Sequence, residues 1–427
     1  MVAPIEVPET VGERCVILGS GFSRAISDHM PTMVELSGEV LSQLSLNPNR
    51  LDPFSGDLEQ WMSYLSVDQP WLTPSQNLTN RALFADVSGA VNSCILNAEG
   101  KVVLEPMPDW LLRLAWTWCD SETNVFSFNY DTLVERAVTQ LGRLGTWGDL
   151  YATSLSSRST PGDGGAMFPV FSPLAPLLRM FKLHGSTSWA FSGLDSSPSD
   201  RIVLTADRLT WHGRKDPEDP VPPRYMSRFD DVVPLIIPPT LTKGPYYSNL
   251  ALKAQWRRAA TYLASASTLA VVGYSFPNAD LVARQWVSTS FSGKRMDIVD
   301  RSLERPDQIR AGLPGALAGI DNTGVSAVEE YVDRICGPLV RWQIWSAGDE
   351  FGARVKLIVN GNDLVAHIAP ADMPWGNEPD EAQRWVHERI ERNAPGAING
   401  ARSESGRPGS LESRFVVLPP GATVDIS

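Results

Sequence analysis

The sequence is poor in cysteine and has no long apolar run. Its 427 residues contain four cysteines, and no two of them form a CxxC pair: Cys15, Cys94, Cys119 and Cys336. This spacing argues against a structural zinc site and is typical of reduced thiols in a cytoplasmic protein. No apolar stretch approaches the roughly 20 residues that span a bilayer. The polar, proline-containing residues 1–12 are unlike a signal peptide. The sequence therefore predicts a cytoplasmic protein with no membrane segment and no metal.

Positive charge is also scarce. The chain has 37 Lys and Arg residues against 49 Asp and Glu residues, which gives a formal net charge of −12. Such a balance argues against a nucleic-acid-binding face and against docking on anionic membranes. Because 43% of the residues are hydrophobic, the chain can bury a large core, and its length suggests at least two domains.

Short apolar segments alternate with helical patterns over the first 300 residues. Four of these segments lead directly into glycine or polar residues: 15–18, 125–128, 181–183 and 269–272. The alternation predicts an α/β fold with a Rossmann-like, doubly wound parallel sheet. The carboxyl ends of the strands in such a sheet share one edge, and ligands bind there.

Two regions interrupt this alternation. Apolar residues recur at helical spacing between about residues 31 and 118, which predicts a helical cap inserted after the first strand–helix unit. Beyond about residue 301, alternation around Asn360-Gly361-Asn362 predicts a hairpin. A charged segment at 378–393 predicts a helix, the Gly-, Ser- and Arg-rich segment 396–413 a flexible stretch, and 415–418 a last strand. We therefore predict one domain at 1–300 and a small α+β region at 301–427.

The first polar segment combines glycines with the start of a helix, and reads Gly19-Ser20-Gly21-Phe22-Ser23-Arg24. Glycines after a strand let backbone N–H groups approach a pyrophosphate, and a helix N-terminus adds positive potential. The third glycine of the usual dinucleotide fingerprint is absent, so an ordinary strand–helix turn is an equal alternative. Arg24 either meets a phosphate or ribose, or faces solvent.

Asn129 and Asp131 follow the second apolar segment. An amide is both donor and acceptor, so Asn129 can bind a ribose hydroxyl or orient a water molecule; a turn is its structural alternative. Asp131 can accept from a sugar hydroxyl, but capping the helix predicted from Thr132 is the more common role.

The third and fourth segments add an imidazole and hydroxyl groups. His184, one of five histidines, can take a proton near pH 7, although a lone histidine more often makes a structural hydrogen bond. Gly273 and Ser275, with Asp280 close behind, are predicted at the same sheet edge. Asp300 ends the next strand and can hold a ribose, or form a turn.

In this order, the motifs GSGFSR, FNYD, KLHGS and GYSFPNAD resemble those of the sirtuin-like NAD-binding domain, in the bacterial branch of antiphage-defence NADases. The resemblance covers roughly residues 15–300. It implies that Asn129 positions the attacking water and that His184 is the base. The residues that it implies for binding NAD are Gly19, Ser20, Gly21, Phe22, Ser23, Arg24, Asp131, Gly273, Ser275 and Asp300.

The sequence also departs from the protein-deacylating sirtuins. It lacks their zinc module with two CxxC pairs, and a long helical segment follows the glycine loop. The resemblance therefore implies hydrolysis of NAD to nicotinamide and ADP-ribose, by a gated effector of antiphage defence. It further implies a homo-oligomer or a partner protein, such as a defence ATPase or sensor, with residues 301–427 as the regulatory or assembly region. The alternatives are an NAD-dependent deacylase or ADP-ribosyltransferase, and a non-catalytic NAD or ADP-ribose sensor.

Overall fold

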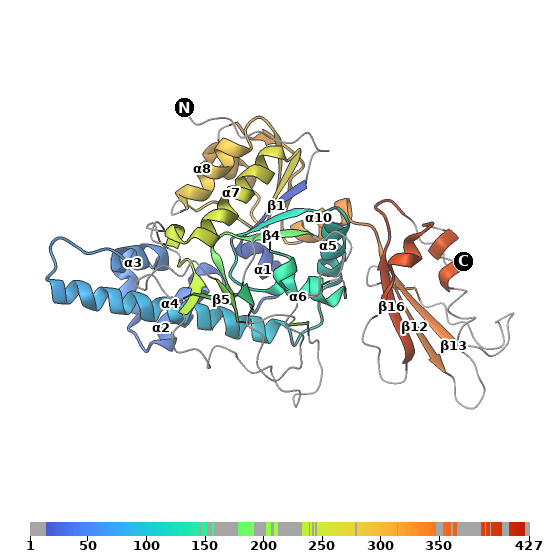
Figure 1. Cartoon of the computed structure of the whole chain (residues 1–427), viewed down its shortest axis with the longest axis horizontal. Helices are drawn as coiled ribbons and strands as arrows, with labels where there is room; N and C mark the ends of the chain where they lie inside the picture. Colours follow the sequence, from blue (N-terminus) through green and yellow to red (C-terminus); the bar gives the residue numbers. More distant parts are fainter. Residues whose placement is uncertain are drawn as a thin grey trace. The chain divides into compact units, whose positions relative to one another are not determined.

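The computed structural model divides the chain into two compact units (Figure 1). The first comprises Met1–Pro106, Trp118–Thr139 and Arg143–Val328, and the second comprises Met107–Thr117, Gln140–Gly142 and Glu329–Ser427. The structure describes residues 14–142, 144, 147–151, 156–157, 178–191, 202–205, 209–211, 233–238, 240, 243, 246–277, 280–313, 315–346, 353–359, 362–364, 386–388, 390–392, 394–403 and 410–422.

A parallel sheet forms the centre of the first unit. Its strands follow the order β10-β9-β8-β1-β2-β4, and β11 also pairs with β9. Their bounds are β1 (Arg14–Leu18), β2 (Asn124–Ser127), β4 (Arg179–Lys182), β8 (Thr268–Val272), β9 (Arg295–Asp300), β10 (Leu317–Ala318) and β11 (Asn322–Thr323). All the described pairings in this sheet are parallel. The predicted Rossmann-like α/β fold is confirmed.

The direction in which the sheet grows reverses between β1 and β8. From β1 the chain adds β2 and β4 on one side, and later it adds β9 and β10 beyond β8 on the other. Right-handed crossovers then place the two sets of helices on opposite faces. One face packs on α7 (Leu250–Ser265), α8 (Leu281–Ser290) and α9 (Arg305–Gly312). The helices α1 (Ser20–Ile26) and α6 (Leu133–Gln140) belong to the other face.

The predicted helical insertion is present between β1 and β2. It contains α2 (Met33–Gln43), the 3-10 helix η1 (Pro48–Phe54), α3 (Leu58–Leu65), α4 (Pro74–Val102) and α5 (Asp109–Asp120). Capping boxes begin two of these helices, with Thr32 and Glu35 at α2 and Thr73 and Gln76 at α4. The long helix α4 contacts α2 and α3 (Figure 1).

A second sheet is formed by residues that precede and follow β4 in the sequence. It contains β3 (Ser156–Ser157), β5 (Gly185–Phe191), β6 (Val203–Leu204) and β7 (Val233–Ile236), in the order β3-β6-β5-β7. Gly185 has φ +84°, and a Cβ there would lie 2.1 Å from the carbonyl oxygen of Leu235. A glycine is therefore required directly after His184, because the chain passes there from one sheet to the other.

The second unit carries an antiparallel sheet in the order β14-β13-β12-β16-β15. Its strands are β12 (Leu339–Ser346), β13 (Ala353–Val359), β14 (Asn362–Leu364), β15 (Arg402–Ser403) and β16 (Ser410–Val417), and α10 (Ala327–Ile335) precedes them. The predicted hairpin corresponds to β13 and β14, although residues 360–361 lie outside the described part. Residues 386–388 and 390–392 of the predicted helix are helical.

Two features of this end of the chain were not predicted. Two further parallel strands, β10 and β11, follow the strand that ends at Asp300, and both pair with β9. The segment 396–413 contains β15 and the first part of β16, and its residues 404–409 lie outside the described part. Within the described residues, no helix combines the length and the apolar character needed to cross a membrane.

Candidate functional site

The loops that follow β1 and β8 pack backbone against backbone at the sheet reversal. The N–H of Gly19 donates to the carbonyl of Val272 at 3.1 Å, and the N–H of Gly21 donates to that of Gly273 at 2.9 Å. Gly273 has φ +62°, and a Cβ there would lie 2.2 Å from the nitrogen of Phe22. The close approach of the two loops thus explains the glycines. The N–H groups of Gly19 and Gly21 therefore have acceptors within the protein, and the binding of a phosphate by this loop stays a prediction.

Some of the remaining residues of the glycine loop are exposed and others are buried. Ser20 and Gly21 are exposed at the start of α1. Phe22 is buried, with its ring centroid 6.1 Å from that of Trp118. The guanidinium of Arg24 bonds to the carbonyl of Met30 at 2.9 Å and to Oδ1 of Asp28 at 3.2 Å. Phe22 and Arg24 therefore have partners within the protein, and their predicted contacts with NAD stay predictions.

A short chain of hydrogen bonds joins the loop after β2 to the loop after β1. Nδ2 of Asn129 donates to the carbonyl of Gly19 and to Oγ of Ser23, both at 2.8 Å. Oγ of Ser23 donates to Oδ2 of Asp131 at 2.6 Å, and the N–H of Leu133 donates to Oδ1 at 3.2 Å. Asp131 therefore accepts from the N–H of the first residue of α6 (Leu133–Gln140), close to its predicted capping role, although the helix begins one residue later than predicted.

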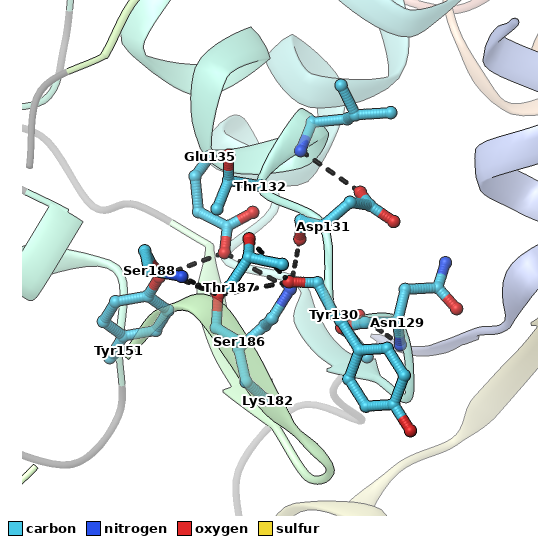
Figure 2. A network of polar contacts seen from close by, with 12 residues as sticks. Asn129, Tyr130, Asp131, Thr132, Glu135, Tyr151, Lys182, Ser186, Thr187 and Ser188 are labelled. Atoms are coloured by element: carbon cyan, nitrogen blue, oxygen red, sulfur yellow. Dashed lines mark hydrogen bonds and ion pairs between the residues drawn. The ribbon is translucent and has the colours of Figure 1, made fainter. Parts of the chain in front are cut away.

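Buried charges support this loop from within the protein. Nζ of Lys182 donates to the carbonyl oxygen of Asp131 and lies 3.5 Å from Oε1 of Glu135. The hydroxyl of Tyr151 donates to the same Oε1 at 3.0 Å. Burial raises the pKa values of Asp131 and Glu135, and the charge of Lys182 opposes both shifts. Figure 2 shows Lys182 between Glu135 on one side and Asp131 and Asn129 on the other.

His184 is the centre of a second polar cluster. Its Nε2 lies 3.2 Å from Oδ2 of Asp280 and 3.5 Å from Nζ of Lys243. Nζ of Lys243 also forms an ion pair with Oδ1 of Asp280 at 3.1 Å, and the hydroxyl of Tyr274 donates to Oδ2 at 2.5 Å. The imidazole packs edge-on against the ring of Phe128, with centroids 4.9 Å apart. All five side chains are buried.

Burial and neighbouring charges set the protonation states in this cluster. Burial lowers the pKa of His184; Asp280 opposes the shift and Lys243 adds to it. Burial alone would raise the pKa of Asp280, but His184, Lys243 and Tyr274 hold it below its usual value. The result is a neutral imidazole beside an ionised carboxylate. Because that carboxylate only accepts, Nε2 carries the hydrogen and Nδ1 is the basic nitrogen. Among the described residues, no partner contacts Nδ1.

The helical insertion adds a carboxylate to this region. Oδ1 of Asp57 accepts from the N–H of Glu59 at 2.8 Å and so begins α3. Glu59 is half-buried, and burial raises its pKa; the charge of Lys243 lowers it and that of Asp280 raises it. Sequence reasoning missed Glu59 and Lys243, which no motif marks. Asp280 could have been predicted from the sequence, because it is the last residue of the motif GYSFPNAD.

The remaining predicted residues lie at the same sheet edge or beside it. Ser275 is exposed two residues after Gly273. Asp300 ends β9, and its Oδ1 accepts from the N–H of Ser302 at 2.8 Å, which is the turn that we considered as the alternative.

Asn129 and His184 follow adjacent strands at equivalent positions. Ser127 of β2 is in register with Lys182 of β4, and each predicted catalytic residue comes two positions later. The described contacts of Asn129 run toward β1, whereas those of His184 run toward Asp280 and Lys243. The described contacts of the two side chains share no partner. The proposal that both side chains face one substrate atom therefore stays a prediction.

No protein-family model and no curated protein sequence matches the chain. Among the described residues, no group of three or more His, Cys, Asp and Glu side chains could hold a metal ion. The functional argument therefore rests on the geometry of the sheet edge.

Proposed function

We propose that the chain hydrolyses NAD⁺ to nicotinamide and ADP-ribose. One observation carries the proposal: Asn129 and His184 occupy equivalent positions after β2 and β4, at the carboxyl edge of a sheet that reverses between β1 and β8. Ligands bind at this place in doubly wound sheets. The order of the four sequence motifs adds support, because it resembles that of sirtuin-like NADases.

The reaction replaces one bond to the ribose by another. Water attacks C1′ of the nicotinamide ribose while the bond from C1′ to the nicotinamide nitrogen breaks. Nicotinamide leaves with the electron pair and becomes neutral, and one proton of the water is released. The leaving group is already cationic, so the protein needs to orient the water and stabilise positive charge on the ribose.

Each residue of the site has a role in this scheme. Asn129 orients the water. His184, neutral because burial lowers its pKa, takes a proton from the ribose hydroxyl network through Nδ1. A positioned general base of this kind contributes about 10²- to 10⁴-fold in rate. The ionised Asp280 holds the imidazole in its tautomer, and its charge, with that of Glu59, favours a positively charged ribose.

The biological setting follows from the same resemblance. A free NADase would deplete its own cell, so we propose that the protein is a gated cytoplasmic effector of antiphage defence. Oligomerisation or a partner protein, such as a defence ATPase or sensor, would release its activity. Residues 301–427 are the proposed regulatory or assembly region.

Product analysis in extracts of cells that express the chain, with and without phage infection, tests the reaction, because the proposed gating can hold the chain inactive without its trigger. We expect nicotinamide and free ADP-ribose in equal amounts, and a loss of at least about 100-fold in turnover for Asn129→Ala and for His184→Ala. Asn49→Ala and His29→Ala are matched controls, because both side chains are exposed. Circular dichroism should show that all four variants are folded.

Other outcomes would replace the proposal. Turnover at the wild-type level in both site variants would reject the assigned residues. O-acyl-ADP-ribose or ADP-ribosylated protein would indicate a deacylase or transferase. Tight binding of NAD without turnover, also in extracts of phage-infected cells, would indicate a sensor.

A further inference from the structure

The amide of Asn129 makes two hydrogen bonds through one atom. Both bonds leave from Nδ2, one to the carbonyl of Gly19 and one to Oγ of Ser23. A carbonyl oxygen only accepts, so Gly19 decides which end of the amide is nitrogen. Both N–H groups are thereby used. Among the described residues, Oδ1 of Asn129 has no partner.

Asp131 completes the arrangement through Ser23. Oγ of Ser23 accepts from Asn129, so its own hydrogen must go elsewhere, and Oδ2 of Asp131 lies 2.6 Å away. Both the side-chain carboxylate and the backbone carbonyl of Asp131 accept further hydrogen bonds. Its Oδ1 accepts from the N–H of Leu133 and its carbonyl accepts from the buried ammonium of Lys182 (Figure 2). The direction of every bond in the series is therefore determined.

We propose that Ser23 and Asp131 are positioning residues that leave Asn129 with a single free polar atom, the acceptor Oδ1. This rests on the proposed function and adds the chemical class of the group that Asn129 recognises. An amide fixed in this way binds a donor, such as a water molecule or a sugar hydroxyl. It does not bind the carbonyl oxygen of a carboxamide. A water that donates to Oδ1 keeps its lone pairs free for attack on carbon.

The kinetics of Ser23→Ala test whether Ser23 positions the amide of Asn129. The substitution frees one N–H of Asn129 and lets the amide rotate, and we expect kcat for NAD hydrolysis to fall about 10- to 100-fold, as for other small misplacements of a catalytic group. KM should change less than about threefold, because losing an interaction that acts only in the transition state lowers kcat without weakening the binding of substrate. Ser23→Thr keeps the hydroxyl and should recover most of kcat.

A matched variant separates this role from a loss of packing. Ser37 is also a buried serine on a helix, and its hydroxyl donates to the carbonyl of Met33 at 2.7 Å. Ser37→Ala should lower the melting temperature about as much as Ser23→Ala and leave kcat unchanged. A fall in kcat of the same size in both variants, or none in either, would overturn the proposal.

A second measurement needs no turnover. Selective ¹⁵N labelling of asparagine, with Asn129→Ala for assignment, gives the side-chain amide signal of Asn129 by NMR. We expect slow exchange of both amide hydrogens in the wild type and faster exchange of one in Ser23→Ala. Equal exchange rates of the amide hydrogens in the two proteins would overturn the positioning role of Ser23. If the wild type does not cleave NAD even in extracts of phage-infected cells, the proposed function fails, and this measurement still tests whether Ser23 positions the amide of Asn129.

Discussion

His184 and Lys243 share the carboxylate of Asp280, and this arrangement has consequences for pH dependence. Burial and Lys243 lower the pKa of His184 from 6.5, so the neutral imidazole persists to lower pH than in water. We expect the acid limb of kcat/KM for NAD hydrolysis to lie below pH 6.5. Lys243→Met removes the nearby cation and leaves Asp280, so the pKa of His184 rises and the acid limb moves to higher pH.

The check is a pH–rate profile between about pH 5 and pH 8 for the wild type and Lys243→Met. Lys101→Met is a suitable control, because Lys101 is exposed on α4. An acid limb that stays in place, or that moves to lower pH, would contradict the assignment of His184 as the base.

Glu99 and Arg136 form a buried ion pair next to the loop that follows β2. Nε of Arg136 lies 2.8 Å from Oε1 of Glu99, and side-chain exposures are 10% and 2%. Thr132 also bonds to this carboxylate. Arg136→Met leaves a buried carboxylate without its cation, which should lower the free energy of unfolding by about 3 to 5 kcal/mol.

Urea denaturation measures this difference, and a double variant provides the control. Arg136→Met with Glu99→Leu removes both charges, and should recover much of the stability lost in the single variant. If the two substitutions were simply additive, the pair would not be coupled as the geometry indicates.

At the scale of elements, the interlocked loops after β1 and β8 depend on Gly273. Gly273→Ala introduces a Cβ at a positive φ and 2.2 Å from the backbone of Phe22. We expect a loss of at least about 1 to 3 kcal/mol in the free energy of unfolding. Gly89→Ala lies inside α4 with nothing within 4 Å of the added Cβ, and should be neutral or stabilising by up to about 1 kcal/mol. Thermal denaturation of both variants checks the contrast, and equal melting temperatures would contradict it.

At the scale of the whole molecule, the units are not contiguous in sequence. Residues 107–117, most of α5, belong to the second unit, where Nε of Arg113 donates to the carbonyl of Gly337 at 2.9 Å. A fragment of residues 1–300, which ends at the boundary predicted from sequence, lacks that partner and also β10 and β11.

We therefore expect the fragment 1–300 to be insoluble or to melt well below the full chain, because it leaves the buried Arg113 unpaired and the edge of β9 open. Calorimetry of the two proteins measures this. A fragment that unfolds cooperatively at the temperature of the full chain would show that residues 1–300 fold independently.

Much of the fold follows from local patterns. The four apolar segments became β1, β2, β4 and β8 within a few residues, because strands buried on both faces read as continuous apolar runs. The helical insertion was predictable from its apolar spacing. The strands β10 and β11 were missed because each has two residues, too few to show a pattern.

Less of the site could be predicted. The roles of Asn129 and His184 as catalytic residues stay predictions. The glycines of the first loop were recognised in the sequence, but the reason for them was not. Their lack of a side chain lets a second loop, about 250 residues further along the chain, pack against the first. Lys243 and Glu59 carry no local signal, because their position depends on how the second sheet and the insertion pack.

The amino-acid sequence by itself determined the alternation of strands and helices, and with it a sheet edge lined by polar residues. Only the tertiary structure decided which of those residues meet. Hydrogen bonds and ion pairs act over a few ångströms, so whether Asn129 reaches Ser23, or His184 reaches Asp280, depends on packing between segments about 100 residues apart.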